Sequence, residues 1–202
     1  MATHEPPLTT RLVLGPDDAG RPVSADEYAT ADYREPWKYE RADGRLRVMA
    51  PDGYDHQITA EPWRNELSLY KSKHPERVQH VFPNAWVRVD DDSDLIGDIG
   101  VYLVSDEVAT NPPDRSPELM FEILSPGRAS NDRDYVRKRD DYFRAGIREY
   151  VIIDRFTRTV TVFSQGAAGY DERKLSINDV YTSALLPGLS IPLAGVMGSQ
   201  ES

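Results

Sequence analysis

The stretch PELMFEILSP, residues 117–126, has the alternation of a buried β-strand with an acid inside it. Side chains 119, 121 and 123 are expected on one face, and Met120, Glu122 and Leu124 on the other. A carboxylate is almost never fully buried unless it is paired, hydrogen-bonded or bound to a metal. The strand therefore predicts a partner for Glu122, and the following Ser-Pro-Gly ends it.

A second acid, Asp98, opens the apolar run DIGVYLV at residues 98–104. This run and residues 78–89 are expected to be strands separated by the acidic loop DDDSD. Two carboxylates on neighbouring strands repel each other unless a cation lies between them. Oxygen ligands from Asp98 and Glu122, with the backbone carbonyl of Leu124, suit Mg²⁺ or Mn²⁺. The two runs therefore predict a divalent-metal site, and Glu40 could help to hold a second ion.

Downstream of this strand, residues 132–145 predict a helix that Gly146 ends. On a helical wheel Lys138 lies at the edge of an apolar arc that includes Tyr142, and Asp134 stands four residues before it. The lysine side chain can extend from a packed face toward a site on the sheet. There it would orient or deprotonate a water and offset charge on phosphate oxygens. A solvated helix with i,i+4 ion pairs is the alternative interpretation.

The remaining segments predict a mixed sheet with helices on its faces. Ser24 and Glu27 form a capping box that opens a short helix through Thr30. Asp43-Gly44, between WKYE and RLRVMA, predicts a hairpin. YVIID and TVTVFS predict a second hairpin, and residues 170–175 a further strand.

A helical stripe over residues 56–74 is interrupted by Pro62. A proline is tolerated in the first turn of a helix but removes a hydrogen bond from its interior. We therefore expect that the helix either kinks at Pro62 or begins at Glu61. In the first case His56 stands at the helix start.

Composition limits the classes of protein to which the chain can belong. Its 202 residues are 39% hydrophobic and 29% charged, which is typical of one globular domain. We expect an irregular segment over 1–23, a domain over 24–196 and a flexible tail over 197–202 that includes GSQES. The chain has no bilayer-length apolar run, no secretory signal pattern and no cysteine, so a cytoplasmic protein without membrane contact is predicted.

The charge pattern bears on nucleic-acid binding. A net charge of −10 argues against non-specific nucleic-acid binding, which usually needs a basic face. It leaves a nuclease possible, because local charge matters more than the total. Basic residues concentrate between Arg128 and Arg148, mixed with aspartates.

The succession DIGVYLV, PELMFEILSP and DRDYVRKRDDYFRAGIREYVIID resembles the putative restriction endonuclease domain family of bacteria, within the PD-(D/E)XK nuclease superfamily. The resemblance covers roughly residues 24–196, including the DH of GYDHQI and the stretch SALLPGLSIPL. It implies an α/β (α+β) restriction-endonuclease-like core: a central mixed β-sheet flanked by α-helices, here with an additional N-terminal hairpin. It also implies Mg²⁺- or Mn²⁺-dependent cleavage of DNA and, by analogy, a homodimer.

The resemblance assigns roles to single residues. Its two acids correspond to Asp98 and Glu122, its helix acid to Glu40 and its displaced lysine to Lys138. Asp98, Glu122 and Glu40 would hold metal together with the carbonyl of Leu124. Leu124 stands where a lysine usually follows the glutamate, and this makes Lys138 critical.

The sequence departs from the family pattern at two positions, and three further residues are candidates for the site. Gly97 replaces the proline that usually precedes the first acid, and Pro62 lies in a segment that is normally helical. His56, Asp134 and Tyr142 are candidates for accessory roles.

Two other functions compete with a metal-dependent endonuclease. A catalytically weak or inactive relative could serve as a DNA- or protein-binding module. The acidic charge favours this reading, whereas the complete set of Glu40, Asp98, Glu122 and Lys138 opposes it. An enzyme acting on sugars or nucleotides has little support, because we find no glycine-rich phosphate loop, metal–histidine motif or nucleophile elbow.

Overall fold

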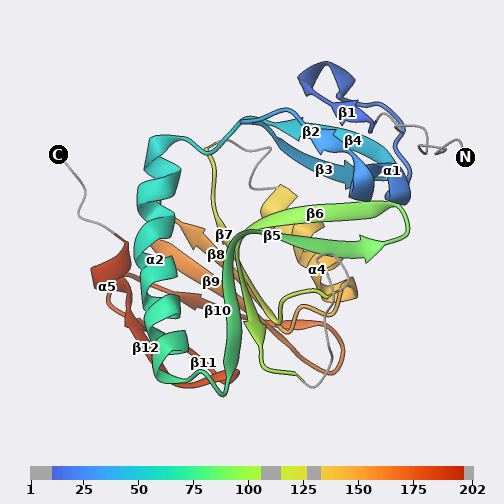
Figure 1. The fold of residues 1–202 in the computed structure, drawn as a ribbon. Helices are drawn as coiled ribbons and strands as arrows, with labels where there is room; N and C mark the ends of the chain where they lie inside the picture. Colours follow the sequence, from blue (N-terminus) through green and yellow to red (C-terminus); the bar gives the residue numbers. More distant parts are fainter. Residues whose placement is uncertain (1–10, 106–114, 127–132, 198–202) are drawn as a thin grey trace, which may run out of the picture. The chain divides into compact units, whose positions relative to one another are not determined.

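The computed structural model describes residues 11–105, 115–126 and 133–197 of the chain (Figure 1). Predictions for Arg128, for the first position of the helix over 132–145 and for the tail GSQES lie outside the described residues. The chain divides into two compact units. Residues 1–51 and 91–93 form the first, and residues 52–90 and 94–202 form the second.

The first unit contains the predicted N-terminal hairpin. Strands β3 (Lys38–Ala42) and β4 (Arg45–Met49) pair antiparallel. The turn between them has positive φ at both Asp43 and Gly44, 53° and 69°, which is the conformation that Asp-Gly favours in two-residue hairpin loops. Both the hairpin and its turn are therefore confirmed.

The first unit also contains the predicted capped helix, α1 (Ala25–Thr30). The Ser24 hydroxyl accepts a hydrogen bond from the amide of Glu27, and the Glu27 carboxylate accepts one from the amide of Ser24. Tyr28 is buried and donates from its hydroxyl to the carbonyl of Tyr39, which ties α1 to the hairpin. The unit is completed by β1 (Val13–Leu14), η1 (Pro16–Asp18) and β2 (Asp32–Tyr33).

The second unit contains a mixed sheet with the order β10-β9-β8-β7-β6, and β5 pairs with β6. Along this order only β7 and β8 are parallel, and a helical crossover joins them. The strands are β5 (Val78–Asp90), β6 (Ser93–Leu103), β7 (Leu119–Ile123), β8 (Glu149–Asp154), β9 (Thr159–Gln165) and β10 (Tyr170–Leu175). The helices are α2 (Tyr54–Lys73), the π-helix η2 (Arg133–Lys138) and α4 (Arg139–Arg144).

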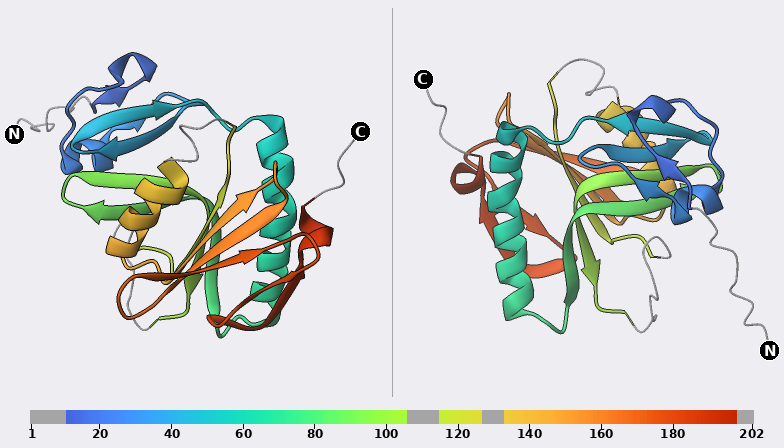
Figure 2. Two further views of the ribbon diagram at one scale, coloured as in Figure 1. Left: turned by 180° about the vertical axis from the view of Figure 1, so that it is seen from behind. Right: turned by 45° about the horizontal axis from the view of Figure 1, so that its top comes forward.

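Helices cover both faces of this sheet, as Figure 2 shows for α2 and α4. On one face Trp63 of α2 packs against Phe121, with ring centroids 6.0 Å apart. On the other face Tyr142 of α4 lies in a cluster with Met120. The predicted alternation along β7 is confirmed, and it places Glu122 on the α4 side of the sheet.

One predicted boundary is wrong, and the structure decides between the two alternatives given for another. The expected loop DDDSD shrinks to a turn at residues 91–92, because β6 already begins at Ser93. Asp94 can lie in this strand, buried, because its carboxylate pairs with Arg88 at 3.0 Å. Helix α2 does not begin at Glu61 but runs through Pro62 from Tyr54. The carbonyl that loses its donor belongs to Ile58, a residue that is 48% exposed, so water can replace the missing hydrogen bond.

The sequence analysis did not indicate several short elements. These are β1, β2, β11 (Val180–Ser183), β12 (Leu186–Pro192) and α5 (Leu193–Val196). β1, β2, β11 and α5 have two to four residues each, too few for a clear hydrophobic period, and β12 contains Pro187 and Gly188, which weaken a strand signal. Among the described residues, no helix combines the length and apolar character that crossing a bilayer requires.

Gly97, the residue in place of the usual proline, lies in β6 directly under Met120. A Cβ atom at Gly97 would stand 2.0 Å from the Met120 Sδ. Met120 is fully buried, so its side chain has little room to move away. Any side chain at position 97, that of proline included, would therefore clash with Met120, and glycine avoids this clash.

We expect Gly97→Ala to lower the free energy of unfolding by about 1–3 kcal/mol, because it overpacks the core against Met120. In a Met120→Ala background the same change should cost less than about 0.5 kcal/mol, because the obstructing sulfur is gone. Urea denaturation of the four proteins measures this coupling. Additive effects of the two substitutions would contradict the packing argument.

Candidate active site

Glu122 and Lys138 form a buried ion pair on the α4 side of the sheet. The Lys138 Nζ lies 2.7 Å from the Glu122 Oε1, and each side chain is only 6% exposed. Lys138 also donates to the carbonyl of Ile96, at 2.9 Å. The Tyr142 hydroxyl donates to the same Oε1 of Glu122, at 2.7 Å. One carboxylate oxygen thus receives both hydrogen bonds, and these leave Oε2 of Glu122 as the natural ligand atom for an ion.

The helix that carries Lys138 is not uniform. Residues 133–138 form a π-helix, and an ordinary α-helix continues from Arg139 to Arg144. Single π-helical turns are rare and are frequently found at functional sites. Here the π-turn ends at Lys138, and Tyr142 follows one turn later. Both side chains end on the Glu122 carboxylate.

The environment of Glu122 disfavours its charged form. Burial raises its pKa to about 8, and the neighbouring carboxylates of Asp98 and Asp134 raise it too, whereas Lys138 acts in the opposite direction. Two further acids close to a buried acid are a typical environment for a bound cation, which would favour ionisation of all three.

Asp98 is brought beside Glu122 by the pairing of β6 with β7. The register aligns Ile99 with Phe121 and Gly100 with Met120, and the Asp98 carboxylate lies close enough to Glu122 to raise the pKa of Glu122. The Asp98 Oδ2 accepts a hydrogen bond from the amide of Ile123 at 2.8 Å. The carboxylate thus has a fixed position within the sheet.

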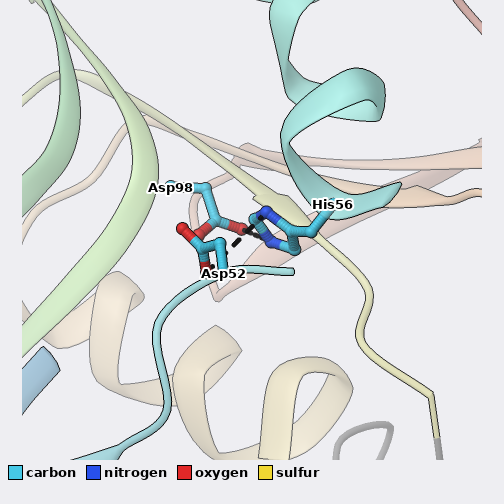
Figure 3. Close-up of side chains that lie close together, drawn as sticks. All are labelled: Asp52, His56 and Asp98. Atoms are coloured by element: carbon cyan, nitrogen blue, oxygen red, sulfur yellow. Dashed lines mark hydrogen bonds and ion pairs between the residues drawn. The ribbon is translucent and has the colours of Figure 1, made fainter. Parts of the chain in front are cut away.

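His56 and Asp52 lie beside Asp98 (Figure 3). The His56 Nε2 is 3.0 Å from the Asp98 Oδ2, and its Nδ1 is 3.8 Å from the Asp52 Oδ1. One ligand atom from each of the three residues lies within 4.8 Å of the others. His56 stands in the first turn of α2, and Asp52 precedes that helix.

The donor atoms of this site fit a divalent ion. The carboxylates of Asp98 and Glu122 are hard oxygen donors of the kind that Mg²⁺ and Mn²⁺ prefer. Burial is the main cause of the raised pKa of Glu122, and the carboxylates of Asp98 and Asp134 add to it, so a bound cation would favour the ionised form. The sequence-predicted Asp98, Glu122, Lys138 and Tyr142 all lie around this point, and His56 contacts Asp98.

The three further predicted site residues are all buried. Asp134 is buried on η2, and its backbone carbonyl accepts a hydrogen bond from the Tyr150 hydroxyl at 3.1 Å. Leu124 is buried directly after β7, and its amide donates to the carbonyl of Ile153. Glu40 is buried on β3 of the first unit, and its part in metal binding stays a prediction.

Sequence reasoning missed three contributors. Asp52 was not singled out, although its spacing of four residues from His56 is a signal that could have drawn attention to it. The carbonyl of Ile96 and the amide of Ile123 hold Lys138 and Asp98, respectively. Main-chain groups leave no trace in the sequence, so these two contacts required the structure.

The mixed sheet flanked by helices, with Lys138 paired to Glu122 and Asp98 nearby, defines an α/β protein of the restriction-endonuclease-like class. The chain belongs to the Uma2 family, described as "Putative restriction endonuclease", whose sequence profile matches residues 25–194. The predicted family is thereby confirmed. No curated protein matched the chain.

Comparison with solved structures supports the fold. A structure described as a putative nuclease belonging to DUF820, from Anabaena variabilis, is similar, with a TM-score of 0.69. The two proteins are 14% identical, and the match covers 87% of this chain and 98% of the other. The similarity confirms the predicted fold class.

Proposed function

We propose that the protein is a metal-dependent endonuclease that hydrolyses phosphodiester bonds in DNA. The observation that carries this proposal is the buried pair of Glu122 and Lys138 beside Asp98, in a chain of the family described as "Putative restriction endonuclease". A buried lysine and two acids at one point of a sheet are costly for stability alone. Their cost is understandable if they bind an ion and a phosphate.

Each residue has a definite task in this proposal. Mg²⁺ or Mn²⁺, when bound, would polarise the scissile phosphate and lower the pKa of a water molecule. Asp98 and the Oε2 of Glu122 would hold the ion, with the Leu124 carbonyl and Glu40 as further candidates. Lys138, held by Glu122 and the Ile96 carbonyl, would place its positive charge where charge develops on the phosphate oxygens. Tyr142 keeps the Glu122 carboxylate in position.

The remaining parts of the proposal concern organisation. We propose residues 24–196 as the catalytic domain and a homodimer as the form that cuts both strands, since a symmetric pair of sites suits a double-stranded substrate. A cytoplasmic location is part of the same proposal.

A plasmid-cleavage assay with Mg²⁺ or Mn²⁺ tests the function. We expect the wild-type protein to cut supercoiled, linear or single-stranded DNA, and Asp98→Asn to lose at least about 100-fold in rate, since a charged ligand is replaced. Asp140→Asn is the matched control, because Asp140 is an exposed acid on α4 that pairs with Arg139. If the wild-type protein binds these substrates but cuts none of them, the binding-module alternative replaces the nuclease.

A further inference from the structure

We propose that His56 supplies a nitrogen ligand to the metal centre, and that this ligand makes the site prefer first-row transition ions such as Mn²⁺ and Co²⁺ over Mg²⁺. The inference rests on the proposed function, because it concerns the same metal centre. It assigns the selectivity of that centre to one side chain. Asp52 would be the positioning residue that orients the imidazole.

The distance between His56 and Asp98 fits two ligands of one ion. Their facing atoms, Nε2 and Oδ2, are 3.0 Å apart. Adjacent ligands of an octahedral ion with bonds near 2.1 Å stand about 3 Å apart. The two side chains therefore present a ready-made edge of a coordination sphere, and both are largely buried, at 11% exposure.

Asp52 occupies the place of an outer carboxylate. Metal-binding histidines usually donate from the ring nitrogen that does not bind metal to a carboxylate or carbonyl. The Asp52 Oδ1 is 3.8 Å from the His56 Nδ1, and the Asp52 carboxylate lies beside that of Asp98 (Figure 3). A small tightening of this contact would fix the proton on Nδ1 and direct the Nε2 lone pair toward the ion.

The charges around His56 are also consistent with a cation. The start of α2 carries a partial positive charge that would oppose a metal ion. Asp52, Asp98 and Glu122 provide three carboxylates to offset it. Asp55, also in the first turn of α2, pairs with Arg155 at 3.3 Å.

A nitrogen ligand from His56 would change which divalent ion the site binds most tightly. Mg²⁺ binds oxygen almost exclusively, whereas imidazole nitrogen is a good ligand for later first-row ions, and affinity rises from Mn²⁺ to Co²⁺. A site built only from Asp98 and Glu122 would discriminate little between Mg²⁺ and Mn²⁺. With His56 as a ligand, Mn²⁺ should bind at least about tenfold more tightly than Mg²⁺, and Co²⁺ more tightly still.

Metal titration of the full, DNA-free chain tests the inference. Calorimetry with Mn²⁺, Co²⁺ and Mg²⁺ should give a Mn²⁺/Mg²⁺ affinity ratio of at least about ten for the wild type and near one for His56→Gln. His74→Gln is the matched control, because His74 stands at the opposite end of the same helix, beside Glu76. It should leave the ratio unchanged.

A spectroscopic measurement on the wild type makes the test independent of folding in the variants. Spin-echo modulation of bound Mn²⁺ should show coupling to an imidazole nitrogen, and this coupling should vanish in His56→Gln. If no nitrogen coupling is present, or if His56→Gln weakens Mn²⁺ and Mg²⁺ equally, His56 only orients Asp98 and the inference is wrong. If Asp98→Asn leaves Mn²⁺ binding intact, the proposed metal centre itself is wrong.

Discussion

Lys138→Met should lower the rate of DNA cleavage by about 10²–10⁴-fold, the range expected when a group that moves a proton or stabilises developing charge is removed. Lys138 is the cation whose amine touches Glu122, and no other described lysine makes that contact. Methionine keeps the length and packing of the side chain, so the loss would report on the charge. Single-turnover cleavage with saturating metal measures it.

Two further variants sharpen this prediction. Lys174→Met is the control, because Lys174 is an exposed lysine on β10, and its cleavage rate should match the wild type. Lys138→Arg should recover only part of the rate, since the planar guanidinium cannot occupy the place of the ammonium between Glu122 and the Ile96 carbonyl. A full rate for Lys138→Met would remove the lysine from the mechanism.

The metal-free wild-type protein should lose stability as pH rises from about 4.5 to 8, whereas Glu122→Gln should lose less. The pKa of Glu122 is raised to about 8 in the folded protein, chiefly by burial, and an unfolded chain has the ordinary value of 4.5. The folded state therefore binds this proton more tightly. Its contribution is fully present below pH 4.5 and is lost as pH rises through the folded pKa.

Urea denaturation of both proteins, with a chelator present and at pH values between about 5 and 9 in steps of about one unit, measures this dependence of stability on pH. The difference in unfolding free energy, wild type minus Glu122→Gln, should fall by an amount on the order of a few kcal/mol across this window. Saturating metal should abolish most of the trend, because a bound cation favours the ionised carboxylate. A flat difference would mean that Lys138 keeps Glu122 ionised throughout.

Much of the fold followed from local signals in the sequence. The alternation along β7, the Asp-Gly hairpin and the capping box of Ser24 and Glu27 each depend on a few neighbouring residues, and all three are confirmed. The start of β6 was predicted wrongly and the start of α2 was left open, because both depend on the surroundings of single residues rather than on a sequence period. Arg88 allows Asp94 to be buried in β6, and solvent at Ile58 allows Pro62 inside α2.

The site was less predictable than the fold. Glu122 and Lys138 could be selected as candidates because each interrupts or borders an apolar face. The contact between the Lys138 amine and the Glu122 carboxylate is made from a π-helical turn that ends at Lys138, and no sequence pattern predicted that turn. The contact between His56 and Asp98 joins residues 42 positions apart in the chain, so no local pattern could give it.

The position two residues after Glu122 has a consequence for how this protein can change. Leu124 is 2% exposed and belongs to the apolar cluster that also holds Tyr142. Because the lysine that contacts Glu122 comes from η2, the side chain at position 124 can pack in the apolar interior. The amine that we propose for catalysis and the apolar side chain at this position thus belong to separate residues. Substitutions at Leu124 can therefore change the packing of the interior without replacing the lysine that we propose for catalysis.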